Sequence, residues 1–147
     1  MQANSINSSR YEPSDFSLWE EGSIQLVLRA GGYYIPDVTE GGLHICLNKQ
    51  SCFSFLSRMN AVLCFYFDAR SFEAGELTVT LGEQVLLSQD ISQDAQCRAY
   101  FAISPGANDL SFNFSGNRHF SIFNPKKLDS RILDFKIINP QVEVISY

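Results

Sequence analysis

Histidine is scarce in this 147-residue chain, which holds only His44 and His119, and the common catalytic motifs are missing. The sequence contains no GxSxG nucleophile elbow, no HExxH metal-binding pair, no P-loop and no glycine-rich dinucleotide fingerprint. Both histidines fall in segments where apolar residues alternate, and a lone histidine in a strand usually faces solvent or a hydrogen-bond partner. We therefore predict a protein that is not an enzyme.

Basic residues are also few and scattered. Lysine and arginine total 11 against 16 acidic residues, the net charge is -5, and the largest basic cluster is Lys126–Lys127. Nucleic-acid recognition needs a concentrated basic surface, so we predict no nucleic-acid partner. No apolar run reaches the length of a membrane span, and residues 1–15 lack the apolar stretch of a signal peptide. These absences predict a cytoplasmic protein with no membrane span.

The four cysteines lack the CxxC spacing of zinc ribbons and redox motifs. Three of them lie among apolar and aromatic residues, which predicts buried free thiols in a reducing compartment instead of a disulfide framework. The four cysteines are Cys46, Cys52, Cys64 and Cys97.

Carboxylates do not cluster with the spacing of a metal site. The predicted loops "SPGANDLS" and "SQDISQDAQ" offer Asn108, Asp109, Asp90 and Asp94, but neither has the dense alternating carboxylates that are specific for calcium. We assign no metal and no cofactor.

What the sequence does have is a period of two. Short apolar or aromatic runs separated by Gly, Pro, Asn and Asp are typical of strands, and no convincing helix lies between them. About eleven short strands predict an all-β protein, an antiparallel sandwich or barrel. The predicted strands span residues 24–30, 43–47, 52–57, 61–69, 76–81, 84–91, 97–104, 109–115, 119–123, 131–138 and 142–147.

Turn residues set the predicted hairpins and the domain boundary. Gly82-Glu83 separates two alternating runs, and Gly116-Asn117 separates two more, so each pair predicts a tight hairpin. Residues 1–22 lack this rhythm and are predicted to be a leader or a capping segment whose apolar side chains cover an open end of the sandwich. Residues 23–147 form the predicted β-sandwich domain.

Aromatic and acidic residues gather in one predicted loop, "RAGGYYIPDVTEGG". Tyr33 and Tyr34 follow one glycine pair, and Asp37 and Glu40 precede the next. Tyrosine rings beside carboxylates suit sugar binding, because the apolar face of a pyranose stacks on the ring and acidic oxygens accept hydrogen bonds from its hydroxyls. The alternative is that both tyrosines cap the edge of the core with their hydroxyls in water.

Two segments, "GGYYIPDVTEGGLHICL" and "NPKKLDSRILDFKIINPQVE", resemble parts of the jelly-roll accessory domains of bacterial surface-polysaccharide glycosyltransferases and phosphoglycerol-transferase-like proteins. "LTVTLGEQVL" fits between them in order. Positions that match the family pattern are Tyr33, Tyr34, Glu40, Asp129 and Arg131. The chain departs from the pattern at His44, where the family has an aromatic residue, and at Asp134, where it has glycine.

The resemblance implies a jelly roll of about ten or eleven strands. It also implies a non-catalytic module, like a carbohydrate-binding module, that binds or positions a glycan beside a polysaccharide-building glycosyltransferase. The predicted ligand-binding residues are Tyr33, Tyr34, Asp37, Glu40 and His44.

The segment "FNPKKLDSRILDFKI" raises a separate question, because Asp129 and Arg131 are either a ligand site or a structural clasp. The planar guanidinium of Arg131, with its five donors, is suited to fold back on carboxylates or loop carbonyls. We therefore favour a clasp that closes the end of the sandwich.

Two other functions stay open on the sequence alone. A protein-interaction or oligomerisation module would use exposed aromatic residues such as Tyr66, Phe72 or Tyr100, and the chain would then associate with itself or a catalytic partner. A small enzyme built on the same scaffold is the third hypothesis. The sequence ends inside a predicted strand, "VEVISY", and we therefore expect the chain to be part of a longer protein.

Overall fold

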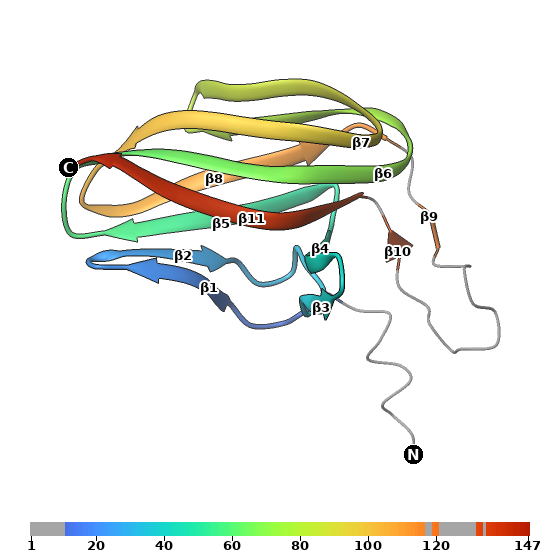
Figure 1. Cartoon of the computed structure of the whole chain (residues 1–147), viewed down its shortest axis with the longest axis horizontal. Coiled ribbons are helices and arrows are strands. Elements are labelled where there is room, and N and C mark those ends of the chain that lie inside the picture. The colour runs from blue at the N-terminus through green and yellow to red at the C-terminus, as the bar shows by residue number, and fades with distance from the viewer. Residues whose placement is uncertain (1–10, 117–118, 121–131, 134) are drawn as a thin grey trace, which may run out of the picture.

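The computed structural model describes residues 11–116, 119–120, 132–133 and 135–147, and all regular structure in these ranges is antiparallel β-strand (Figure 1). The fold class predicted from the sequence is therefore confirmed. No helix with the length and apolarity of a membrane span occurs in this part of the chain. The strands are β1 (Phe16–Glu21), β2 (Ile24–Leu28), β3 (Asp37–Thr39), β4 (Gly42–Leu47), β5 (Gln50–Ser57), β6 (Ala61–Leu81), β7 (Gln84–Ile103), β8 (Gly106–Phe114), β9 (His119–Phe120), β10 (Ile132–Leu133) and β11 (Phe135–Ser146).

Two long strands, β6 and β7, build the sandwich. They pair with each other on both sides of a bulge, and in Figure 1 β6 lies between β7 and β11 along the length of the molecule. The first half of β6 pairs with β11, and its second half pairs with β8. The β6–β7 ribbon thus passes from one layer to the other. Layer A consists of β3, β4, β11, the first half of β6 and the second half of β7. Layer B consists of β1, β2, β5, β8, the second half of β6 and the first half of β7.

The ribbon changes layer at a β-bulge between Ser71 and Gly75. A Cβ on Gly75 would lie 2.5 Å from the backbone nitrogen of Gly116 and 2.8 Å from the ring of Phe114. Only a residue without a side chain fits this close approach, because real Cβ contacts are not that short.

A cluster of phenylalanine rings lies in the core between the layers, among leucine and isoleucine side chains. Phe53 and Phe112 of layer B stack with their ring centroids 4.6 Å apart. Phe65 and Phe67 of layer A lie against them, with centroids 5.7 Å from Phe53 and from Phe112 respectively. Burying a side chain of this size contributes roughly 1.5–3 kcal/mol. Along strands such as β8, residues whose side chains enter this core alternate with residues whose side chains lie on an outer face of the sandwich.

Several details of the strand prediction were wrong. Runs 61–69 and 76–81 are one continuous strand, β6, and residues 84–103 are one strand, β7, because the long ribbon bends instead of stopping. The "SQDISQDAQ" segment, predicted as a loop, lies within β7 for the same reason. Residues 16–21, which lack an alternating pattern, nevertheless form β1 by pairing with β2.

The two predicted tight hairpins have different outcomes. The first is confirmed, since β6 ends at Leu81, β7 begins at Gln84, and Gly82 has a φ of 60°. The second is wrong, because β8 pairs with β5 and β6, and β9 pairs with β10. The predicted Asp129–Arg131 clasp lies outside the described residues.

Candidate functional site

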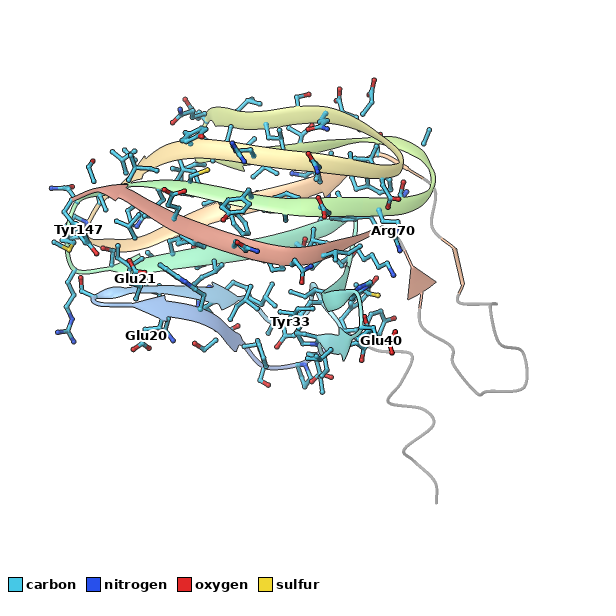
Figure 2. The ribbon with its side chains drawn as sticks, in the orientation of Figure 1. Glu20, Glu21, Tyr33, Glu40, Arg70 and Tyr147 are labelled. Carbon is cyan, nitrogen blue, oxygen red and sulfur yellow. The ribbon has the colours of Figure 1, made fainter. Side chains whose placement is uncertain are left out.

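Tyr33 and Tyr34 are buried, with 2% and 4% of their surface exposed. Figure 2 shows Tyr33 between β2 and the β3–β4 hairpin. The Tyr33 hydroxyl donates to the carbonyl oxygen of Ser14 at 2.7 Å, so it is bonded within the protein. Burial raises the pKa of the Tyr33 hydroxyl, with Glu12 and Asp15 adding to the effect. Their burial leaves neither ring a free face on which a sugar could stack.

The chain segment before β1 covers these tyrosines. The Tyr11 ring lies 4.5 Å from the Tyr34 ring, centroid to centroid. The backbone of Glu12 donates to the carbonyl oxygen of Tyr33 and accepts from the nitrogen of Gly31, both at 2.7 Å. Residues 11–15 therefore pack over the tyrosine pair, an arrangement that no local sequence pattern indicates.

The other predicted ligand residues lie on the β3–β4 hairpin at the edge of layer A. Asp37 is exposed and pairs across the hairpin with His44. Glu40 is exposed at its turn, and Figure 2 shows it on the outside of the hairpin. The structure thus places Asp37, Glu40 and His44 on one hairpin. The two tyrosines adjoin the same strand β4, at Leu47 and Cys46, but they are buried.

An asparagine on β11 holds this hairpin in place. Asn139 has a φ of 51°, which asparagine tolerates better than most residues. Its side chain accepts from the nitrogen of Leu43 at 2.9 Å and donates to the carbonyl oxygen of Gly41 at 3.2 Å. A Cβ on Gly42 would lie 2.0 Å from the Asn139 oxygen, so glycine is required there. Asn139 therefore fastens the hairpin to β11 and fixes its turn.

The imidazole of His44 sits beneath the hairpin turn, close to Gly41. Its Nε2 atom is shielded from solvent and has no hydrogen-bond partner in the described structure. Partial burial lowers the pKa of His44, as do the charges of Lys136 and Arg70, while Asp37 acts in the opposite direction. His44 is therefore neutral at neutral pH, when it can neither hold an anion by charge nor release a proton.

The outer face of layer A carries a row of side chains that continues from His44. Cross-strand pairing aligns His44 with Ile138, Asp68 and Gln96. Next to this row lies an open hollow of about 580 Å³. Its polar lining residues come from β6, β7 and β11 and are Tyr66, Asp68, Gln96, Arg98, Asn139 and Gln141.

Aromatic and cationic groups meet at this hollow. The guanidinium carbon of Arg98 lies 5.5 Å from the centroid of the Tyr66 ring, within the range of a cation–π contact. The Tyr66 hydroxyl donates to the Gln141 amide oxygen at 2.7 Å. Tyr100, two residues after Arg98 on β7, has 58% of its surface exposed. In the described structure Arg98 has no ion-pair partner, so its donors are available to a ligand.

The sequence held a signal for this face that the site prediction did not use. Cys97, Ala99 and Phe101 are buried, so the residues between them point outward. Alternation alone thus places Arg98 and Tyr100 on one exposed face of β7. The hairpin at Gly82-Glu83 predicted that β6 pairs with β7 near the turn. The partners further along, Tyr66 and Asp68, could not be predicted, because two register shifts lie between the turn and Arg98.

The outer face of layer B is polar as well, and some of its polar groups are bonded to one another. Arg29 pairs with Asp15 at 3.0 Å and donates from Nε to the Ser54 hydroxyl at 2.7 Å. Ser54, which is fully buried, donates in turn to Asp109. Asp15 also accepts from the nitrogen of Ala30, and this bond, with Arg29, lowers the Asp15 pKa. The network thereby joins the segment before β1 to β2, β5 and β8.

All four cysteines are free thiols, and Cys64 and Cys97 are buried. Burial raises the pKa of Cys97 to about 11, and the charge of Asp68 acts in the same direction. A thiol with so high a pKa is a poor nucleophile at neutral pH. The described residues include no group of three or more His, Cys, Asp or Glu side chains placed to hold a metal ion.

No family model and no curated protein matches this sequence. Among solved structures, the chain is similar to a carbohydrate-binding module of Cellvibrio mixtus lichenase 5A in complex with cellotriose. This match has 8% identity and a TM-score of 0.42, and it covers 90% of this chain and 97% of that chain. A second similar structure is the CBM35 of Cellvibrio japonicus Abf62, with 10% identity, a TM-score of 0.39, and coverage of 89% and 97% respectively.

A third is a family 43 arabinoxylan arabinofuranohydrolase from Bacillus subtilis in complex with cellotetraose. It has 12% identity and a TM-score of 0.45, and the match covers 95% of this chain but 28% of the enzyme. These likenesses are of overall fold.

Proposed function

We propose that the protein is a non-catalytic module that binds a glycan on the outer face of layer A. The observation that carries the proposal is the hollow beside Tyr66 and Arg98, with the exposed ring of Tyr100 next to it on β7. A sugar ring presents one apolar face and a rim of hydroxyls, so it needs an aromatic surface flanked by donors and acceptors.

Each side chain of this face has a part in that chemistry. The exposed Tyr100 ring offers the stacking surface. The amides of Gln96 and Gln141 can both donate and accept, as sugar hydroxyls do, and the Asp68 carboxylate accepts only. Arg98, held against Tyr66, supplies donors from a guanidinium that the ring has already positioned.

The hairpin residues predicted from the sequence form one border of the proposed site. Asp37 and His44 lie in the cross-strand row that leads to Asp68, and Glu40 lies at the turn. In this proposal Asp37 and Glu40 contact the more distant units of an oligosaccharide. Tyr33 and Tyr34 act from beneath, by packing against the segment before β1 and supporting the chain that enters β3.

We further propose that the module works beside a polysaccharide-building glycosyltransferase in the cytoplasm. The support for the first part is the resemblance of the 31–47 and 124–143 segments to accessory domains of such enzymes. The support for the second is the set of four free thiols, which suits a reducing compartment. A test is co-purification of the tagged protein from its own cells, which should recover a glycosyltransferase from the cytosolic fraction.

The binding proposal is tested by isothermal calorimetry against bacterial surface-type oligosaccharides, using the wild-type protein, Tyr100→Ala and Tyr147→Ala. Tyr147 is 67% exposed and lies beyond the end of β11, outside the hollow, so it is the matched control. We expect Tyr100→Ala to weaken binding by about tenfold, since stacking on an aromatic ring contributes about 0.5–1.5 kcal/mol beyond the area that it buries. Equal affinities of all three proteins for a bound sugar would contradict the placement of the site.

A further inference from the structure

In the part of the chain that the structure describes, no strand pairs with one edge of β7. Among the described residues its only partner strand is β6, although β7 spans 20 residues. An open edge presents unpaired backbone donors and acceptors, and proteins usually protect it with proline, lysine or a short strand. The β7 sequence, "QVLLSQDISQDAQCRAYFAI", contains neither proline nor lysine.

One hydrogen bond identifies which residues face that edge. The carbonyl oxygen of Gln96 accepts from the side-chain amide of Gln89 at 3.2 Å. Gln89 belongs to β7 itself, in the half that lies in layer B, so this bond spans the open side of the sandwich and places the Gln96 carbonyl there. In a strand the N–H and C=O of one residue point to the same side, and the direction alternates along the chain. Asp94, Gln96 and Arg98 therefore direct their backbone groups to the open edge, and their side chains lie on the outer face of layer A.

We propose that this edge pairs with the same edge of a second copy of the chain, antiparallel, with a two-fold axis at Gln96. Such an interface is isologous, so each contact occurs twice. A two-fold axis at Gln96 sets Asp94 opposite Arg98 of the second copy, and Arg98 opposite Asp94 of that copy. In the dimer the Arg98 guanidinium therefore keeps for a ligand only those of its five donors that the carboxylate does not use. The two Gln96 residues exchange backbone hydrogen bonds across the axis, and the N–H of the second copy replaces the side-chain amide of Gln89 as the donor to the Gln96 carbonyl.

Charge complementarity selects this register. Moving the axis to Asp94 would place two aspartates opposite each other, and moving it to Arg98 would do the same with two arginines. Directly opposed like charges are destabilising and opposite charges are stabilising in antiparallel pairs. Asp94 already contacts Arg70 at 2.6 Å, but two-thirds of its side-chain surface (66%) is exposed, which leaves room for the second guanidinium.

The dimer would join two outer faces of layer A. Gln96 and Arg98 line the hollow of the proposed glycan site, so the hollows of the two copies would lie on either side of the axis. Two adjacent sites on a rigid sheet bind a long, repeating ligand with higher avidity than one site does. The dimer does not require that a sugar bind there, since it depends on the backbone edge and the charge pairs alone.

The test is sedimentation analysis over a concentration series. Wild-type protein should show a mass that rises from monomer to dimer, and Arg98→Glu and Asp94→Arg should each weaken association by about tenfold or more, because each variant opposes like charges twice. An equal mixture of the two variants should restore the dimer, because one chain then carries acidic side chains at both positions and the other carries basic side chains at both.

Glu83→Lys is the matched control, because it reverses an exposed charge at the β6–β7 turn, far from Gln96. It should leave association unchanged. Thermal melting of each variant shows whether the fold is intact, and Gln96→Lys, which opposes two lysines at the axis, replaces any variant that does not fold. A wild-type mass that stays monomeric up to the solubility limit would overturn the proposal, as would an association that both charge reversals leave intact.

Discussion

The two outer faces of the sandwich use similar polar residues in different ways. On layer B, Asp15, Arg29, Ser54 and Asp109 form a closed network of hydrogen bonds and an ion pair. On layer A, Arg98 rests on a tyrosine ring with no ion pair in the described structure. Groups that satisfy one another stabilise the fold, and groups left available to solvent can bind a ligand. Layer A also holds one ion pair, between Arg70 and Asp94 at 2.6 Å, so the contrast concerns the region of the hollow around Arg98. On this comparison we propose a structural role for the first face and a binding role for the hollow on the second.

The largest expected effect comes from the core that both faces share. Phe112 is fully buried and stacks on Phe53, so Phe112→Ala should lower the free energy of unfolding by about 3–5 kcal/mol. Denaturant unfolding measures this. A loss below about 1 kcal/mol would mean that the layers do not depend on each other.

A smaller loss of stability is expected on layer B. Ser54→Ala removes the hydroxyl that accepts from Arg29 and donates to Asp109. It should lower the free energy of unfolding by about 1–3 kcal/mol, because both partners are charged. The control is Ser111→Ala, an exposed serine on β8 beside it, which should change stability by less than about 0.5 kcal/mol. Glycan binding should not change in either variant. Loss of binding in Ser54→Ala with the fold intact would move the site to layer B.

Lowering the pH should reduce the stability of the protein through His44 on layer A and through Asp15 on layer B, in different pH ranges. The pKa of His44 is lower in the folded protein than its unfolded value of 6.5, so the unfolded state takes up the proton first and stability falls as the pH drops below that value. The Asp15 pKa is also lowered, so the contribution of its carboxylate is present above pH 3.8 and is lost as the pH falls through its folded pKa.

Thermal melting from pH 7 to pH 3 measures both effects. His44→Gln should remove part of the loss that begins near pH 6.5, and Asp15→Asn should remove part of the loss below pH 3.8. A His44→Gln profile parallel to that of the wild type would show that this histidine does not titrate differently in the two states.

The smallest effect on stability is expected for Tyr100→Ala. Its ring is 58% exposed, so removal should change the free energy of unfolding by less than about 0.5 kcal/mol. This contrasts with its predicted effect on glycan affinity. A stability loss comparable to that of Ser54→Ala would show that Tyr100 packs as a structural residue.

The fold class could be predicted from the sequence because alternation reports directly which residues face the core. Gly82 marked one hairpin correctly for a local reason, its positive φ. Gly116 misled the prediction, because it is required for close packing against Gly75 and Phe114 and not for a hairpin between β8 and β9.

The site was harder to predict, because exposure depends on segments far apart in sequence. Tyr33 and Tyr34 have the composition of a sugar-binding loop, yet residues 11–15 cover them. Conversely, Tyr66 and Arg98 are 32 positions apart and meet only through the β6–β7 register. Composition suggested a class of ligand but could not indicate which aromatic residues remain at the surface.

The most direct test of the contrast between the two faces is a ¹H–¹⁵N NMR titration with a panel of bacterial surface-type oligosaccharides, which detects weak binding residue by residue. Our account predicts shifts centred on the amides of Tyr66, Gln96, Arg98 and Tyr100, with the amides of Arg29 and Ser54 unchanged. A flat response across the panel, or shifts centred on Arg29 and Ser54, would contradict it.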